Sequence, residues 1–155
     1  MITEDYVSFE IAKLLKEKGF NEWCFHCYGV AVLHNGADIS FDEECELKDE
    51  GRENEIEYVE GGRLYNYASN NRENVRAVWA APTLWAAMKW LRELKRCIIV
   101  IIPKWFTPYG CAKYAYSIWA DDNLEIDGET NKDIEYDTYE ETCEKAIKYC
   151  LENLI

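Results

Sequence analysis

The sequence contains only two histidines, His26 and His34, and neither lies in a recognisable catalytic arrangement with a nucleophile. It also lacks the glycine-rich phosphate-binding loop, the G-x-S-x-G nucleophile turn and the dinucleotide-binding fingerprint. Pairs of catalytic carboxylates leave no spacing signature, so a small nucleotide hydrolase stays as one alternative. The absences nevertheless favour a protein without enzymatic activity, and no motif implies a cofactor.

Long apolar runs and a secretory type of N-terminus are absent as well. The longest apolar run, residues 97–103, is far shorter than the ~20 residues of a membrane-spanning helix. Residues 1–5 contain neither the basic stretch nor the apolar core of a secretory signal. The seven cysteines are therefore expected to be free thiols. We expect a cytoplasmic protein with no membrane partner.

Repeats, linkers and low-complexity tracts are also missing, so the 155 residues are expected to form a single domain over 1–155. Hydrophobic residues make up 48% of the chain and aromatic residues 14%. This composition provides a sizeable core and excludes disorder. The formal net charge of −13 opposes non-specific binding to nucleic acid, because the phosphate backbone is repelled at long range.

The charge is distributed unevenly along the chain. Residues 61–120 contain nine basic and two acidic residues, a net charge of +7, and five of the six tryptophans. The acidic residues are concentrated on either side of this segment. Cations beside aromatic rings suit an anionic ligand that carries a ring, because phosphates pair with the cations and bases stack on the rings. The alternative is that the acidic flanks fold over the basic centre and neutralise it.

Three amphipathic helices are predicted. The first begins at Thr3 with two acids in its first turn and ends at Gly19. The second covers residues 82–96, with Pro82 in its first turn, and its apolar stripe is Leu84, Ala87, Met88, Leu91 and Leu94. The third begins at Thr138, which has capping-box spacing to Glu141, and its core face is Tyr139, Cys143, Ala146, Ile147, Cys150 and Leu154.

Three hairpins are predicted between these helices. Asn35-Gly36 predicts a two-residue turn that pairs Val32 with Ile39 and Val30 with Phe41. Gly61-Gly62 predicts a second turn, with the cross-strand pairs Glu60–Arg63, Val59–Leu64 and Tyr58–Tyr65. The acidic run that starts at residue 42 is expected to be a solvated loop. The third hairpin joins strands 97–106 and 112–120 through a Thr-Pro-Tyr-Gly turn.

This order of elements predicts an α+β fold. Strands come in antiparallel pairs with short turns, and no alternation of strand and helix suggests a parallel sheet. We therefore expect an antiparallel sheet built from hairpins, with three amphipathic helices on one of its faces.

Three helical segments carry a resemblance to known proteins. They are residues 6–20 (YVSFEIAKLLKEKGF), 81–93 (APTLWAAMKWLRE) and 138–155 (TYEETCEKAIKYCLENLI). Together they resemble a group of small acidic proteins found in phages and prophages of gut bacteria, which has no established activity. The resemblance covers about a third of the chain and none of the hairpins. It implies a phage accessory protein that acts on the host, in the cytoplasm of that bacterium, and it implies no catalytic residue.

The first candidate site is a stripe on the middle helix, formed by Trp85, Lys89, Arg92 and Arg96. These positions are spaced i, i+4, i+7 and i+11, so they share one side of a helix, away from its apolar stripe. The tryptophan could stack on a ring while the cations hold phosphates. Alternatively, the stripe is a solvated helix face, or an interface between two copies of the chain, since aromatic residues and arginine are enriched there.

The second candidate cluster lies in the strand and loop before this helix. It comprises Arg63, Tyr65, Tyr67, Asn70, Asn71, Arg72 and Arg76. Arginine offers bidentate contacts to phosphate, and asparagine can read the edge of a base. An ordinary polar loop is the alternative, because asparagine and serine are common turn residues.

The motif Cys24-Phe25-His26-Cys27 has the spacing of metal ligands. A structural zinc site needs four ligands, and no second C-x-x-C is present to supply them; Cys45, Cys111 and His34 are the only other candidates. If the segment is a strand, Cys24 and Cys27 point to opposite faces. We therefore expect no metal.

Two functional hypotheses follow, in addition to the hydrolase. The first is a non-catalytic binding protein that sequesters an anionic, ring-bearing small molecule such as a nucleotide signal and thereby counters a host defence. The second is an acidic inhibitor whose runs at residues 42–60 and 121–144 mimic the charge of nucleic acid and occupy a basic host protein.

Overall fold

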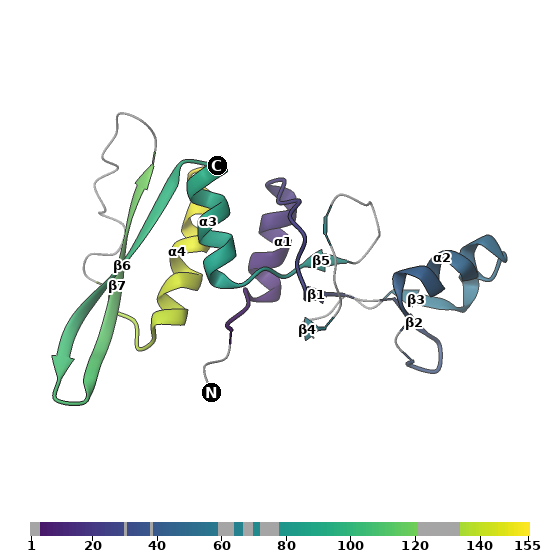
Figure 1. Ribbon diagram of the computed structural model, residues 1–155, viewed down its shortest axis with the longest axis horizontal. Helices are drawn as coiled ribbons and strands as arrows, with labels where there is room; N and C mark the ends of the chain where they lie inside the picture. Colours follow the sequence, from purple (N-terminus) through teal and green to yellow (C-terminus); the bar gives the residue numbers. More distant parts are fainter. Residues whose placement is uncertain are drawn as a thin grey trace.

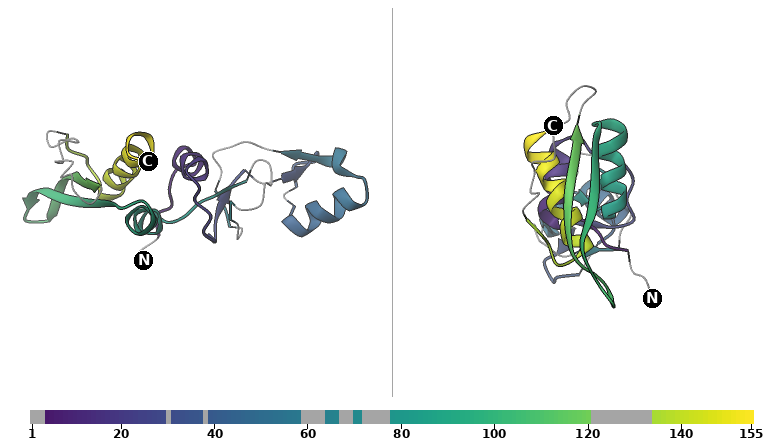
Figure 2. Two further views of the ribbon diagram at one scale, coloured as in Figure 1. Left: turned by 90° about the horizontal axis from the view of Figure 1, so that it is seen from above. Right: turned by 90° about the vertical axis from the view of Figure 1, so that its left-hand side faces the viewer.

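The computed structural model describes residues 4–29, 31–37, 39–58, 64–66, 70–71, 78–120 and 134–155. In this part of the chain, four α-helices and three small antiparallel sheets form an α+β fold, as the sequence predicts. The sequence predicted one sheet and three helices, whereas the described residues form three separate sheets and four helices. The elements follow one another along an elongated molecule, from a long hairpin at one end to a small lobe at the other (Figures 1 and 2).

The long hairpin consists of β6 (Cys97–Thr107) and β7 (Gly110–Ala120). One of its faces packs on helices, and Ile118 is completely buried there. On the other face Ile98 and Trp119 lie opposite each other and are 46% and 48% exposed. The two strands predicted from residues 97–106 and 112–120 are confirmed, because a long alternating apolar run specifies a strand locally.

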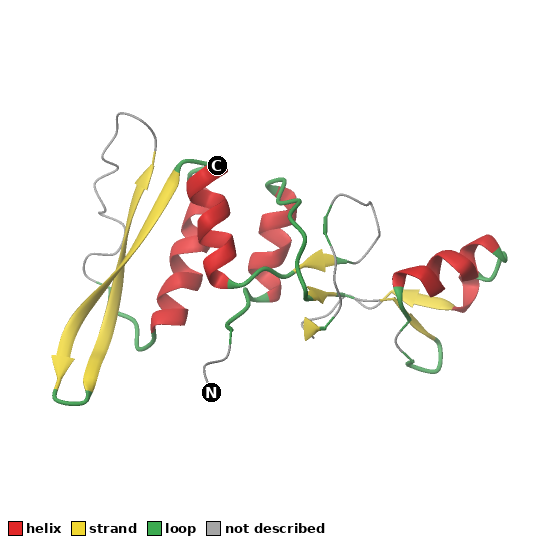
Figure 3. Cartoon of the chain, in the orientation of Figure 1, coloured by secondary structure: helices red, strands yellow, loops and turns green. Residues whose placement is uncertain are grey.

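Three helices form a layer beside this hairpin; helices are red in Figure 3 and the hairpin is yellow. Helices α3 (Leu84–Leu94) and α4 (Tyr139–Asn153) pack on the hairpin, and α1 (Phe9–Glu17) packs against α4 on the side away from it. The main hydrophobic core lies between these elements and includes the completely buried side chains of Ile11, Leu15, Leu91, Ile147 and Leu151.

The predicted apolar faces of the helices are correct except at their ends. Leu94, the last residue of α3, is 63% exposed, and Tyr139, the first residue of α4, is 45% exposed, because the helix ends extend past the core. Trp90 is buried instead, between the apolar stripe of α3 and Phe20, whose ring it meets edge to face at 5.4 Å.

The first helix begins later than predicted. Its N-cap is Ser8, whose hydroxyl accepts a hydrogen bond from the backbone N–H of Ile11. The residues before it are extended along the segment that precedes α3: the backbone N–H of Val7 donates to the carbonyl of Pro82 at 3.0 Å, and that of Leu84 donates to the carbonyl of Asp5 at 2.9 Å. Pro82 accordingly lies just before the N-cap Thr83 rather than inside the helix.

A small sheet lies beyond α1. Its central strand is β1 (Cys27–Tyr28), flanked by β4 (Leu64–Tyr65) and β5 (Trp79–Ala80), and both pairings are antiparallel. The predicted pairing of Tyr58 with Tyr65 is therefore wrong, since Tyr65 lies opposite Cys27. Residues 59–63, which the same prediction used, lie outside the described residues.

The far end of the molecule is a lobe formed by β2 (Ala31–Leu33), α2 (Phe41–Asp49), a 3-10 turn (Glu53–Glu55) and β3 (Ile56–Tyr58). We call these residues, 31–58, the acidic lobe, because they include ten acidic and two basic residues. The lobe has a small core of its own around Ile39 and Ile56, with Leu33 and Leu47 packed against them.

The predicted first hairpin is wrong, although its turn exists. Gly36 has a φ of +83°, and its N–H donates to the carbonyl of Leu33 at 2.7 Å. The chain then enters α2 at Phe41, and Val32 lies opposite Glu57 of β3 rather than Ile39.

The acidic run expected to be a solvated loop is therefore largely a helix. A capping box starts α2: the Ser40 hydroxyl accepts from the N–H of Glu43, whose carboxylate accepts from the N–H of Ser40. Acidic residues in the first turn and Lys48 in the last also suit the helix dipole. Among the described residues, no helix has both the length and the apolar content needed to cross a bilayer.

Candidate ligand-binding site

A pocket of about 390 Å³ lies between α3 and the segment of residues 20–24 that follows α1. Four aromatic rings line it, from Phe20, Trp23, Trp85 and Trp90, and its charged groups are Glu22, Lys89 and Glu93. Its volume lies within the ~300–1,000 Å³ range of small-molecule sites. We call it the tryptophan pocket.

The amphipathic pattern of α3 positions the ligand-facing side chains. Leu84, Ala87 and Leu91 point into the core, which turns Trp85 and Lys89, one turn apart, to the outside. Trp85 is 64% exposed, and the ammonium of Lys89 lies 5.2 Å from the centre of its ring. This distance is that of a cation–π contact, so charge and ring form one unit.

Further rings of the pocket come from the segment after α1 and from the buried side of α3. Trp23, which is 69% exposed, contributes a second accessible ring from the segment after α1. The buried ring of Trp90 lies at the floor against Phe20, and the ammonium of Lys95 is 5.2 Å from the Trp90 ring centre. Trp23 was not among the site residues predicted from the sequence, and its segment carries no local signal that it approaches α3.

The four residues of the predicted stripe are in different positions. Trp85 and Lys89 line the tryptophan pocket. Arg92 does not line it, and its guanidinium lies 3.6 Å from the carboxylate of Glu93. Arg96 lies two residues beyond the end of α3, with a φ of +56°, in the left-handed conformation common after a helix. The pocket therefore contains one of the three cations together with two carboxylates.

The second predicted cluster is only partly described. Arg63, Tyr67, Arg72 and Arg76 lie outside the described residues. The backbone of Tyr65 pairs in β4, and Asn70 is half-buried. Asn71 is buried and bridges two segments: its amide donates to the carbonyl of Phe20 at 2.9 Å, and its carbonyl accepts from the N–H of Ala80 at 3.0 Å. Asn71 therefore fixes the backbone of Phe20, which lines the pocket, and does not itself line it.

The two cysteines of the C-x-x-C motif are both buried. The expectation that they point to opposite faces required a strand through the whole motif. The strand begins only at Cys27, so the alternation does not reach back to Cys24. Burial raises the pKa of both thiols to about 12, which disfavours the thiolate that a metal needs. Among the described residues, no three His, Cys, Asp or Glu side chains gather as a metal site.

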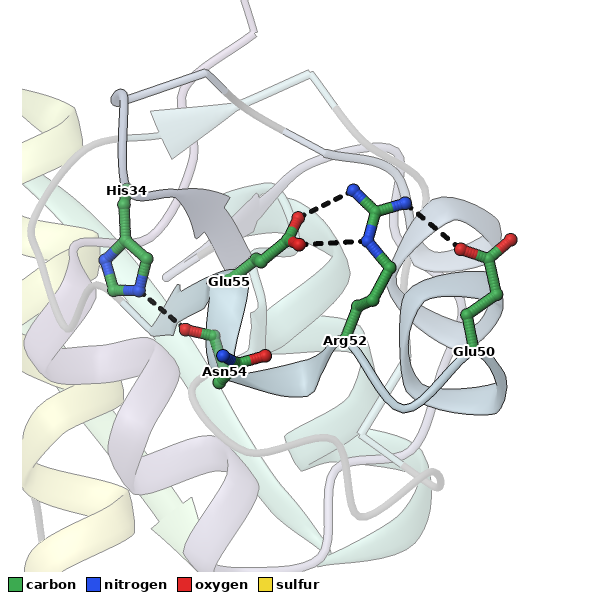
Figure 4. Close-up of polar contacts among 5 residues, drawn as sticks. All are labelled: His34, Glu50, Arg52, Asn54 and Glu55. Carbon is green, nitrogen blue, oxygen red and sulfur yellow. Dashed lines mark hydrogen bonds and ion pairs between the residues drawn. The ribbon is translucent and has the colours of Figure 1, made fainter.

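The basic residues of the acidic lobe are already paired with its own carboxylates. The guanidinium of Arg52 binds Glu55 through two nitrogens, at 2.9 and 2.7 Å, and Glu50 at 3.1 Å (Figure 4). These bonds lower the pKa of Glu55 and raise that of Arg52. Lys48 binds the buried carboxylate of Glu44 at 2.6 Å.

The remaining histidine of the candidate metal set lies in the same lobe. His34 is exposed at the turn, and its Nε2 lies 2.7 Å from the carbonyl oxygen of Asn54 (Figure 4). It thus joins the turn to the 3-10 segment within the acidic lobe.

Comparison of the chain with protein-family models, curated proteins and solved structures finds no match. The fold and the pocket therefore define the class of protein: an elongated α+β protein with an open aromatic pocket and a separate acidic lobe.

Proposed function

We propose that the protein binds an anionic, ring-bearing small molecule of the nucleotide type in the tryptophan pocket, without converting it. The observation that carries this proposal is the exposed ring of Trp85 with the ammonium of Lys89 above it, in a pocket whose other accessible ring is Trp23. A base would stack on the rings, and its phosphate would pair with Lys89. Stacking of one base on an aromatic side chain contributes about 1–3 kcal/mol.

The two carboxylates of the pocket limit which anionic ligands can bind there. Glu22 and Glu93 would repel a molecule that presents phosphates to every side, whereas they can accept hydrogen bonds from the amino groups of a base. The best ligand thus carries both a negative group that can pair with Lys89 and a hydrogen-bond donor for Glu22 or Glu93.

The biological setting comes from the resemblance of the three helices to phage proteins. In that setting the protein would lower the free concentration of a nucleotide signal of the host and so blunt a defence. Sequestration needs affinity and abundance only, and the rings and the ammonium that line the pocket would supply the affinity.

The test is a thermal-shift and calorimetric screen against linear nucleotides, cyclic nucleotides and ADP-ribose-type molecules. A ligand at a hundred times its Kd should stabilise the fold by about 2.7 kcal/mol. The variants Trp23→Ala, Trp85→Ala and the pair Lys89→Glu with Arg92→Glu should weaken binding, and Trp119→Ala, an equally large ring on the hairpin, is the matched control. Unchanged affinity in the charge-reversed variant would refute the site, and recovery of a converted ligand would replace the proposal with the hydrolase.

A second candidate function has its own supporting observation. The acidic lobe forms one end of the molecule, and Lys48 and Arg52 are occupied by internal ion pairs, so a dense negative surface is presented outward. Such a surface suits a basic protein that normally binds nucleic acid. The expected result is capture of such a host protein at low salt that falls steeply as salt rises. Capture that does not change with salt concentration would contradict this second function.

A further inference from the structure

Trp85 also lines a second pocket, of about 280 Å³, in which the charges are of one sign. This pocket lies where the starts of α3 and α4 meet the N-terminal segment. Its remaining side chains with rings or charges are Tyr139, Glu4, Asp5 and Glu140, and no lysine or arginine lines it. We infer that this pocket binds an organic cation, with an alkylated ammonium or a guanidinium as the group recognised.

The aromatic half of the pocket supplies one element of that recognition. Trp85 is 64% exposed and Tyr139 is 45% exposed, and they lie at the starts of α3 and α4. The Tyr139 ring makes an edge-to-face contact with the ring of Tyr114, at 6.0 Å between centroids. The faces of aromatic rings attract alkylated cations, and tryptophan is the strongest of them. Lys89 already makes this type of contact with Trp85.

The acidic half supplies the other element. Glu4, Asp5 and Glu140 are all exposed, so their carboxylates stay accessible to a ligand. Each helix N-terminus contributes a partial charge of only about +0.5, so the two together offset about one of the three negative charges. The potential in the pocket is therefore negative, and an anion is disfavoured.

The backbone fixes this arrangement without help from the ligand. The backbone hydrogen bonds between residues 5–7 and residues 82–84 hold the N-terminal carboxylates against the start of α3. Thr83 caps α3 and Thr138 caps α4, so the helix starts that present Trp85 and Tyr139 are both defined. A preformed site loses less entropy when it binds.

This inference does not depend on the nucleotide proposal, because only Trp85 belongs to both pockets. Lys89 lines the tryptophan pocket alone, while Tyr139 and Glu140 line the cation pocket alone. Lys89→Glu should therefore weaken anion binding without weakening cation binding, and Glu140→Gln should weaken cation binding without weakening anion binding. Failure of one proposal is thus distinguishable from failure of the other.

The experiment is a calorimetric titration of the whole chain with choline and with its neutral isostere 3,3-dimethylbutan-1-ol. Choline is expected to bind about five- to thirty-fold more tightly, and its methyl protons should shift upfield in the NMR spectrum because they lie over aromatic rings. Equal binding of the two compounds, or no binding of either choline or an arginine peptide, would overturn the inference.

Variants locate the effect. Trp85→Ala and Tyr139→Ala should remove most of the difference between the compounds, and Tyr139→Phe should retain it, because the ring and not the hydroxyl is needed. Glu140→Gln should weaken the binding of choline. Glu141→Gln, in the same helical turn but outside the pocket, should leave the affinity for choline unchanged. Equal losses in Glu140→Gln and Glu141→Gln would show a diffuse charge effect and refute the pocket.

A parallel titration distinguishes two sources of the cation. A short peptide with one arginine, compared with its citrulline counterpart, presents the guanidinium of a protein side chain. Preference for choline over the arginine peptide identifies a free small molecule as the ligand, and the opposite preference identifies a basic protein.

Discussion

The carboxylate of Glu144 on α4 accepts hydrogen bonds from both the backbone N–H and the hydroxyl of Ser8, at 2.7 and 3.0 Å. The same hydroxyl caps α1 by accepting from Ile11. One turn further along α4, Lys148 binds Glu10 of α1 at 2.6 Å. A single half-buried carboxylate thus joins the start of α1 to the middle of α4.

Burial raises the pKa of Glu144 above the ordinary value of 4.5, and the hydrogen bonds from Ser8 offset only part of that effect. The folded state therefore binds a proton more readily than the unfolded state, and stability falls as the pH rises from about 4.5 through the raised pKa. In urea unfolding, wild type should lose stability relative to Glu144→Gln over this range. A difference that stays constant with pH would contradict the assignment.

Asn71→Ala should destabilise the protein by about 1–3 kcal/mol, because it leaves the buried N–H of Ala80 and the carbonyl of Phe20 without their partner. For a chain of this size each kcal/mol corresponds to about 2–4 °C in Tm. Thermal unfolding measures the loss. The exposed Asn66 provides the matched control, and an equal effect of Asn66→Ala would show that the bridge is unimportant.

Ser40→Ala should open α2 locally. The variant removes a cap whose loss typically costs about 0.5–2 kcal/mol, and the acidic lobe has only a small core to compensate. Hydrogen exchange should become faster at the amides of α2 and stay unchanged in α1 and α4. Ser8→Ala should give the converse pattern, and uniform acceleration in both variants would mean that the lobe and the body unfold together.

The thiols of Cys24, Cys27, Cys97, Cys143 and Cys150 should resist alkylation at pH 8 in the native protein. All five are buried, and burial raises their pKa, for example to about 11 at Cys143. Mass spectrometry after iodoacetamide treatment should find modification at these positions only when guanidinium is added. Fast native modification of Cys24 or Cys27 would show that the first part of the chain opens.

Sequence alone predicts the elements whose signals are local. The hairpin of β6 and β7 and the helices α3 and α4 follow from alternation, periodicity and the predicted cap at Thr138, whereas the cap at Thr83 was not predicted. The helix α2 also had a local signal, Ser40 with Glu43 three residues later, but the density of charge was interpreted as solvated loop. The strands of the small sheet are two residues long, and their partners lie far away in sequence, so no local pattern specifies them.

The candidate site divides in the same way. The spacing of Trp85 and Lys89 predicted that they share one side of the helix, and the structure adds that the Lys89 ammonium lies over the Trp85 ring. The approach of Trp23 to α3 depends on how α1 and its following segment pack, so tertiary packing sets it. Arg92 pairs instead with its sequence neighbour Glu93 and does not line the pocket.

The acidic lobe leaves and rejoins the body of the protein at one place, because Tyr28 lies directly opposite Leu64 in the antiparallel pair of β1 and β4. In topological terms the lobe is an excursion from the end of a hairpin. The body would need only a tight turn between these two residues to close its chain without the lobe. The charged end is therefore an addition to the path of the chain, with a core separate from that of the body.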